Sequence, residues 1–200
     1  NPGQPTVKAV DGVSLTIAKG ETLGLVGESG SGKSTLGRML AGILAPTSGT
    51  VTMDGAPVLE GGRKAGTRIQ TVFQDPYASL DPRMRVGDIV AEGPLAHGLT
   101  TKSDRVAYVA GHLSRAGLDP ILATRFPHQF SGGQRQRIAI ARALAMQPEV
   151  LVCDEPVSSL DVSIQAQIIN LFLELKRDLN LTILFISHDL SVVRHLSDRI

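Results

Sequence analysis

The sequence has little cysteine and no long apolar run. Its single cysteine, Cys153, excludes an internal disulfide and gives no reason to expect an oxidising compartment. Because Cys153 follows the apolar residues 150–152, we expect a buried, inert thiol. No stretch approaches the roughly 18 apolar residues that would cross a bilayer, and no signal peptide is visible.

Charge is nearly balanced, with 20 Lys and Arg residues against 19 Asp and Glu residues. A broad nucleic-acid-binding surface would normally make the chain strongly basic. We therefore expect no nucleic-acid partner, although this balance does not exclude a local basic patch. A length of 200 residues fits one domain, with or without a small inserted lobe.

A complete phosphate-binding loop is present near the N-terminus. It fits the pattern G-x-x-x-x-G-K-[ST] and lies between a strand expected at 22–26 and a helix expected at 34–44. Its glycines let backbone N–H groups converge on a phosphate, Lys33 can reach the β- and γ-phosphates, and the Ser34 hydroxyl can bind Mg²⁺. The loop alone does not distinguish kinases, GTPases, motors and transporters. The nucleotide-binding residues that it predicts are Gly27, Glu28, Ser29, Gly30, Ser31, Gly32, Lys33, Ser34 and Thr35.

Strand and helix patterns alternate along most of the chain. Two short strands are expected within residues 7–17, around a turn at Asp11-Gly12. Between 76 and 130 only helical patterns occur, at 86–97 and at 103–116, where Ser103 is the expected N-cap. We therefore predict an α/β fold: a P-loop NTPase core with a mostly parallel sheet, flanking helices, N-terminal antiparallel strands and an inserted helical lobe at 76–130. The other expected elements are strands at 50–53, 69–73, 150–153 and 182–186, helices at 132–146, 163–178 and 190–196, a hairpin turn at 54–55 and a surface loop at 61–66.

Two further motifs suit a nucleotide site. Residues 130–137 read Phe-Ser-Gly-Gly-Gln-Arg-Gln-Arg, in which Ser131 can cap a helix and the glycines expose backbone N–H groups. An ordinary capped helix would explain this motif equally well. The strand at 150–153 delivers Asp154 and Glu155 at its carboxyl end, where ligands bind in open α/β sheets. Asp154 suits Mg²⁺ and Glu155 suits activation of a water, while a strand-end turn with solvated acids is the alternative.

Other polar residues follow predicted elements. Residues 158–161 open a helix, with Asp161 or Ser163 near its N-cap, and helix capping alone would explain them. His188 follows the strand at 182–186 and can hydrogen-bond a phosphate oxygen. Gln74 follows the strand at 69–73 and can bind Mg²⁺ through its amide oxygen. Neither residue would establish a site on its own.

The order of these motifs resembles the ATPase subunit of the ATP-binding cassette (ABC) family over nearly the whole chain. The resemblance implies catalytic roles for Glu155, His188 and Gln74, and Mg²⁺ binding by Ser34, Gln74 and Asp154. It also implies that a dimer forms around ATP, with the Lys33 loop of one subunit facing the Ser131 turn of the other. The residues that it adds to the nucleotide site are Ser131, Gly132, Gly133, Gln134 and Asp161.

Finer motifs resemble the peptide-importer branch, which also serves nickel and glutathione uptake. This resemblance implies a peripheral ATPase on the cytoplasmic face of the inner membrane. It would form a homodimer, or a heterodimer with a sibling ATPase, and would work with transmembrane permease subunits and indirectly with a solute-binding protein. The motifs are residues 9–14, 27–30, 74–82 and 157–163, together with Phe130.

The sequence departs from the family in its aromatic residues and in its ends. The family usually stacks adenine on an aromatic ring before the phosphate loop, yet residues 1–26 contain no Phe, Tyr or Trp. The chain starts without Met and stops at Ile200, so we expect 1–200 to be a single ATPase domain trimmed at both ends. A DNA-repair or structural ATPase of the same superfamily is one alternative, but such proteins carry a long coiled coil before the Ser131 motif. A P-loop kinase or GTPase is another, and it would lack that motif.

Overall fold

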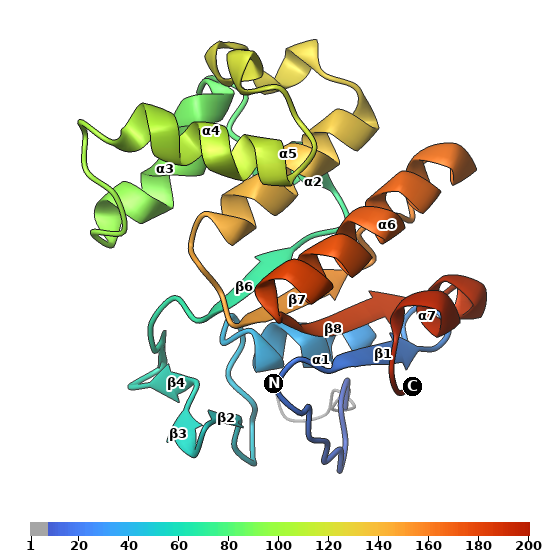
Figure 1. Cartoon of the computed structure of the whole chain (residues 1–200). Coiled ribbons are helices and arrows are strands. Elements are labelled where there is room, and N and C mark those ends of the chain that lie inside the picture. The colour runs from blue at the N-terminus through green and yellow to red at the C-terminus, as the bar shows by residue number, and fades with distance from the viewer. Residues whose placement is uncertain (1–7) are drawn as a thin grey trace, which may run out of the picture.

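Four parallel strands form the centre of the structure, a computed structural model that describes residues 8–200 (Figure 1). Their order across the sheet is β1 (Thr22–Val26), β8 (Thr182–Ser187), β7 (Val150–Asp154) and β6 (Ile69–Val72). All neighbours pair in parallel, so the four carboxyl ends meet at one edge. The predicted mostly parallel sheet is confirmed, and its carboxyl edge carries the candidate site.

Side chains of the central strands alternate between two apolar layers, which explains why helices cover both faces. In β8, Ile183 and Phe185 belong to the core shared with three helices, whereas Leu184 and Ile186 belong to the core on the side of α1 (Lys33–Leu40). Figure 1 shows α1 and α6 on opposite sides of the sheet. The three helices of the first layer are α5 (Gly132–Leu144), α6 (Val162–Leu179) and α7 (Leu190–Leu196).

Only helical elements lie between β6 and α5, and we call them the helical lobe. The lobe has its own apolar core, in which Val90 and Leu113 pack against Ile138 of α5. The N-cap of α4 (Arg105–Arg115) is Asp104, so the prediction of Ser103 was one residue early; Ser103 Oγ instead shares a 2.7 Å hydrogen bond with the Thr101 hydroxyl. The members of the lobe are α2 (Pro76–Ser79), α3 (Val86–Ala96), α4 (Arg105–Arg115) and the 3₁₀ turns Pro120–Thr124 and Pro127–Gln129. Within residues 8–200 no helix combines the length and the apolarity of a membrane span.

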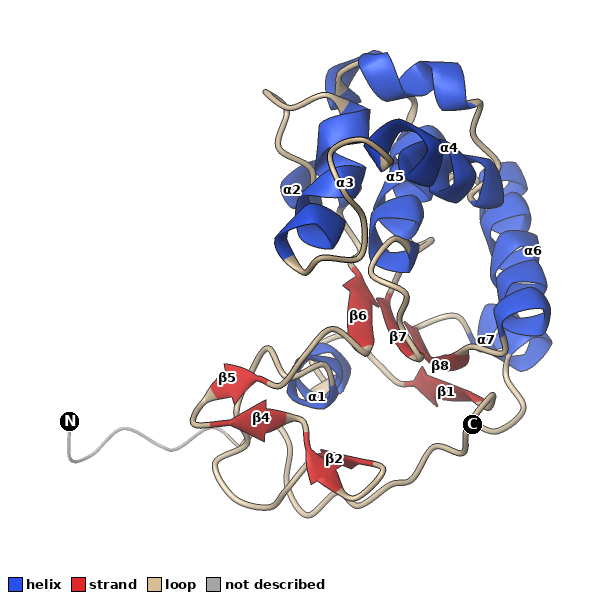
Figure 2. Cartoon of the chain, turned by 60° about the vertical axis from the view of Figure 1, so that its left-hand side comes forward, coloured by secondary structure: helices blue, strands red, loops and turns tan. Residues whose placement is uncertain are grey.

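Two small antiparallel hairpins lie apart from the central sheet (Figure 2). The first joins β2 (Thr52–Met53) to β3 (Ala56–Pro57) through the predicted turn at 54–55, whose two residues have φ values of 52° and 79°. Positive φ at both central positions is typical of a type I′ hairpin turn. The second joins β4 (Leu59–Glu60) to β5 (Arg63–Lys64), where the sequence analysis predicted only a surface loop. That prediction was wrong because the glycines at 61–62 both take positive φ and reverse the chain tightly.

Helix α1 is shorter than predicted. It ends at Leu40 instead of residue 44, because Gly42 takes a φ of 69° and the Ile43 N–H donates back to the Arg38 carbonyl. This left-handed termination turns the chain away from the helix axis. It leaves Ile43 and Leu44 exposed, although their spacing fits an apolar helix face.

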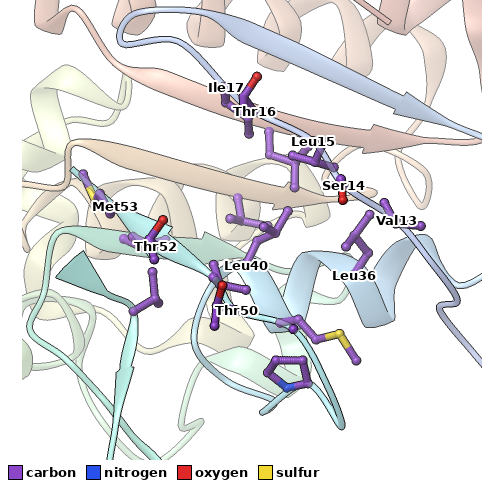
Figure 3. A pocket seen from close by; sticks show the side chains of 18 of the residues that line it. Val13, Ser14, Leu15, Thr16, Ile17, Leu36, Leu40, Thr50, Thr52 and Met53 are labelled. Atoms are coloured by element: carbon purple, nitrogen blue, oxygen red, sulfur yellow. The ribbon is translucent and has the colours of Figure 1, made fainter. Parts of the chain in front are cut away.

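The predicted N-terminal antiparallel strands are not formed within residues 8–17, and residue 7 lies outside the described chain. The alternation itself holds, since Leu15 and Ile17 pack against the α1-side core. A strand also needs a hydrogen-bonding neighbour, and a cavity of about 810 Å³ separates residues 10–17 from residues 46–54. Figure 3 shows Leu15 and Thr52 on different walls of this cavity, with Leu36 and Leu40 of α1 between them. The predicted alternation of apolar residues was therefore correct, but no β-sheet hydrogen bonds form across this cavity within the described chain.

Candidate active site

The phosphate-binding loop connects β1 to α1 in a conformation that needs glycine. Gly30 and Gly32 have φ values of 81° and 92°, and Gly32 is the N-cap of α1. A Cβ on Gly32 would lie 2.1 Å from the Ala9 carbonyl oxygen, so no larger residue fits there. The buried Lys33 side chain donates from Nζ to the Glu28 carbonyl at 2.6 Å and to Ser31 Oγ at 3.3 Å. The loop therefore holds a buried cation beside the first N–H groups of a helix, which suits an anion.

A hydrogen bond joins this loop to the strand-end acids. Ser34 Oγ donates to Asp154 Oδ1 at 2.8 Å, and Asp154 is nearly buried at 8% exposure. A hydroxyl and a carboxylate are the oxygen ligands that Mg²⁺ prefers. No group of three His, Cys, Asp or Glu residues within 8–200 could hold a metal ion unaided. These two oxygens therefore suit a cation that also takes phosphate oxygens and waters as ligands.

Glu155 leaves β7 in a left-handed backbone conformation, with a φ of 49°. Its N–H donates to the Ile186 carbonyl of β8 at 3.0 Å, which holds the turn in place. Its side chain is 16% exposed, and Oε2 lies 3.1 Å from Nδ1 of His188, which is 57% exposed. A residue other than glycine with positive φ is strained, and such strain often marks functional positions. The turn aims the carboxylate at the histidine that follows the neighbouring strand.

Gln74 lies at the same edge of the sheet. It follows β6, whose Val72 is in register with Cys153 of β7, so Gln74 and Glu155 leave adjacent strand ends. Gln74 is exposed. Cys153 is fully buried, and burial together with the Asp154 charge raises its pKa well above the ordinary value. The predicted burial of this thiol is confirmed.

The Ser131 turn forms a capping box at the start of α5. The Gln134 N–H donates to Ser131 Oγ at 3.3 Å, and the Ser131 N–H donates to Gln134 Oε1 at 3.1 Å. A Cβ on Gly133 would lie 2.5 Å from Ile164 Cγ2, so the turn packs tightly against the start of α6. Asp161, the exposed N-cap of α6, makes no capping side-chain hydrogen bond within the described chain.

The predicted site residues thus fall into two groups. The phosphate loop, Asp154, Glu155, His188 and Gln74 gather at the carboxyl edge of the sheet, whereas the Ser131 turn lies beside Asp161. Within residues 8–200 no hydrogen bond joins the loop at 27–35 to the turn at 131–134. The large cavity beside α1 is lined by none of the predicted site residues.

Arg135 and Tyr77 were not singled out from the sequence, yet they are in contact beside the Ser131 turn. The Arg135 guanidinium carbon lies 3.6 Å from the centroid of the Tyr77 ring. Arg135 is buried, whereas an arginine in the first turn of a helix would ordinarily be expected to face solvent. No sequence signal could have paired these two residues, because they come from α2 and α5, far apart along the chain.

Comparisons with known proteins identify the family. A family profile described as ABC transporter matches residues 10–158. The oligopeptide transport ATP-binding protein AppF of Bacillus subtilis is 56% identical over 199 residues, which cover 97% of this chain and 60% of AppF. The chain therefore spans about 60% of the length of the curated relatives that it matches.

Solved structures with the same fold are also found. The cbiO1 protein from Clostridium perfringens, part of the ABC transporter complex cbiONQ, has a TM-score of 0.81 at 33% identity, over 95% of this chain and 76% of that protein. A dimeric, post-hydrolysis state of the ATP-binding cassette MJ0796 bound to ADP and Pi has a TM-score of 0.82 at 29% identity, over 100% of this chain and 91% of that one. The fold, the motif order and the profile match agree: this chain belongs to the ABC transporter family.

Proposed function

We propose that this chain binds ATP with Mg²⁺ and hydrolyses it as the nucleotide-binding domain of an ABC importer. The observation that carries the proposal is the 2.8 Å hydrogen bond between Ser34 Oγ and Asp154 Oδ1. It joins the first turn of the phosphate-loop helix to the carboxylate at the end of β7, and Glu155 follows directly. Both oxygens suit Mg²⁺, with Gln74 as a third ligand from the neighbouring strand.

The phosphate loop fits a triphosphate in the same way. The N–H groups at the start of α1 and the Lys33 ammonium would hold the phosphate oxygens. Phosphate oxygens would then replace the Glu28 carbonyl and the Ser31 hydroxyl as hydrogen-bond partners of Lys33. Mg²⁺, when bound, would neutralise charge on the β- and γ-phosphates. The nucleotide set at this loop is Gly27, Glu28, Ser29, Gly30, Ser31, Gly32, Lys33, Ser34 and Thr35.

Glu155 is placed to act on the attacking water. Its carboxylate would accept a proton as the water oxygen bonds to the γ-phosphorus and the bond from that phosphorus to the β–γ bridging oxygen breaks, which releases ADP. His188, whose Nδ1 lies 3.1 Å from Glu155 Oε2, would orient the carboxylate and lie against the γ-phosphate. Gln74 would contact the same end of the triphosphate. Positioning and charge stabilisation supply most of the rate in such reactions.

The second anion site supports a dimer. The helix start at Ser131, Gly132, Gly133 and Gln134 lies apart from the phosphate loop in the subunit, although both suit a phosphate. One ATP held between the loop of one subunit and the Ser131 turn of its partner would use both, with Asp161 beside the turn. The partner would be a second copy or a sibling ATPase.

The importer assignment rests on relatives. AppF is named as an oligopeptide transport protein, and we extend peptide import to this chain. The chain would then lie at the cytoplasmic face of the membrane, with the helical lobe at 76–130 in contact with permease subunits. A solute-binding protein would deliver the solute to those subunits. No helix between the phosphate loop and Ser131 exceeds 11 residues, which disfavours the coiled coil of DNA-repair ATPases.

Glu155→Gln tests the chemistry. The amide cannot accept the water's proton, so we expect hydrolysis to fall about 10²- to 10⁴-fold while ATP binding persists. An ATP-bound dimer should then accumulate in size-exclusion chromatography. Glu60→Gln, an exposed acid on β4, is the matched control and should behave as wild type. Turnover near wild type in Glu155→Gln, with only monomer in ATP, would show that Glu155 is not the catalytic carboxylate.

Mixing two inactive variants tests the shared site. In a mixed dimer of Lys33→Ala and Ser131→Arg subunits, one composite site carries both substitutions and the other carries neither. Hydrolysis should rise above that of both parents. If Lys33 and Ser131 served one nucleotide within one subunit, every site would keep a lesion. Heterodimers that form without any rescue would refute the shared arrangement.

A further inference from the structure

Arg135 lies beneath the turn that precedes α5. Nε donates to the Pro127 carbonyl at 3.0 Å, and Nη2 donates to the Phe130 carbonyl. These two carbonyls belong to the segment that leads into Ser131, so the guanidinium cross-links this segment by two hydrogen bonds. Arg135 is 6% exposed, and burial lowers its pKa from the ordinary value. Burying a charge costs free energy unless it is compensated, so this position calls for a partner.

Tyr77 supplies that partner from the helical lobe. Its ring centroid lies 3.6 Å from the guanidinium carbon, within range of a cation–π contact. The rest of Tyr77 is largely in solvent, with 63% of the residue exposed, so apolar burial does not account for its position. Its N–H donates at 2.8 Å to Asp75, the residue after Gln74. The ring is therefore joined through a short capped turn to the glutamine at the sheet edge.

One nitrogen of the Arg135 guanidinium, Nη1, makes no hydrogen bond within residues 8–200. This nitrogen is also buried. A buried donor without a partner is costly, which favours a second arrangement of the guanidinium in which this donor is satisfied. A side chain with two arrangements can link two segments that both change on ligand binding.

A second arginine of α5 provides a comparison. Arg142 also contacts α2, where Nη1 donates to the Ser79 carbonyl at 2.6 Å. It lies about two helical turns beyond Arg135 and, within residues 8–200, makes no hydrogen bond with the Ser131 turn. Arg142 therefore joins α5 to α2 without reaching the turn, whereas Arg135 reaches both.

The geometry points to Arg135 as a positioning residue that couples two segments of one subunit through Tyr77. The first is the Gln74 segment, which belongs to the subunit's own nucleotide site. The second is the Ser131 turn, which the subunit presents to its partner's site. This inference rests on the proposed function, in which Gln74 and Ser131 serve different nucleotides. ATP at one site would then favour the arrangement of the turn that closes on the other, and by linkage the reverse holds.

ATP-driven dimerisation of the full chain in the Glu155→Gln background tests the coupling. Tyr77→Leu removes the ring face, so we expect the ATP concentration at half-maximal dimer to rise roughly 5- to 10-fold. The affinity of the dilute monomer for a fluorescent ATP analogue should stay unchanged, because the phosphate loop is untouched. Tyr77→Phe keeps the ring and Arg142→Ala removes only the second contact, so both should keep the parent's midpoint. Thermal melting confirms that each variant is folded.

The outcomes separate the two hypotheses. If the Glu155→Gln parent neither binds ATP nor dimerises, the proposed function fails and the coupling fails with it. If the parent dimerises and Tyr77→Leu has the same midpoint, the coupling alone is refuted. Equal shifts in Tyr77→Leu and Arg142→Ala, or a matching loss of monomer affinity in Tyr77→Leu, would also refute it, because they indicate a general packing effect.

Discussion

Gly37→Ala tests how tightly α1 must pack to hold the phosphate loop. A Cβ at this position would lie 2.6 Å from Cδ1 of Ile186 and 3.5 Å from Cγ1 of Val152. Ordinary carbon contacts are about 3.5–4.0 Å, so either the methyl group or the helix must move by about 1 Å. Cδ1 is the end of the Ile186 side chain, which is fully buried in β8, so to make room it would have to turn against other core side chains. Because α1 begins at Lys33, a shift of the helix would displace the phosphate-binding groups.

Two opposing terms give the expected magnitude. Overpacking a core costs about 1–3 kcal/mol, whereas replacing a helical glycine with alanine gains up to about 1 kcal/mol. We expect a net loss of roughly 1–2 kcal/mol in the free energy of unfolding, measured by urea denaturation without nucleotide. Gly111→Ala in α4 is the matched control, since a Cβ there meets nothing within 4 Å. That variant should gain up to about 1 kcal/mol.

Ile186→Val identifies the contact responsible. It removes Cδ1 and should by itself cost about 0.5–1.5 kcal/mol. If the 2.6 Å approach is the cause, the double variant will be more stable than the sum of the single effects predicts, and ATP affinity lost in Gly37→Ala will return. Additive effects, or equal stabilisation by Gly37→Ala and Gly111→Ala, would refute the argument that this contact positions the loop.

Three further predictions address pH, phosphate binding and base recognition. Burial, with the nearby Arg115 charge, lowers the pKa of His112 from 6.5 to about 4. As the pH drops from 6.5 towards 4, the unfolded chain therefore takes up a proton before the folded chain does, and the free energy of unfolding falls by about 2 kcal/mol at about pH 5. His112→Phe should flatten this pH dependence of the unfolding free energy in urea titrations, and an unchanged pH dependence would contradict the prediction. Lys33→Ala should weaken ATP binding itself in an equilibrium assay, and unchanged affinity would overturn the phosphate-loop assignment. ATP and GTP should bind this chain with similar affinity because residues 1–26 lack an aromatic ring, and strong adenine preference in competition binding would show that another group reads the base.

Local signals made the site predictable. The phosphate loop needs glycines followed by Lys33 within one short segment, and its neighbours β1 and α1 are themselves local patterns. Asp154 and Glu155 were recognisable because an apolar strand precedes them directly. Since the carboxyl ends of parallel strands share an edge, the alternation of strands and helices was enough to predict that these residues lie close together.

Other features depended on the partners that each segment finds in three dimensions. Residues 10–17 alternate like a strand, yet they form none because no described segment pairs with them across the cavity. The left-handed turn at Glu155 depends on the Ile186 carbonyl of another strand. The contact of Arg135 with Tyr77 joins two helices with no shared pattern in sequence. Periodicity and turn chemistry act within a few residues and so can be read from the chain, whereas hydrogen-bond pairing and side-chain stacking depend on distant partners that only the tertiary structure brings together.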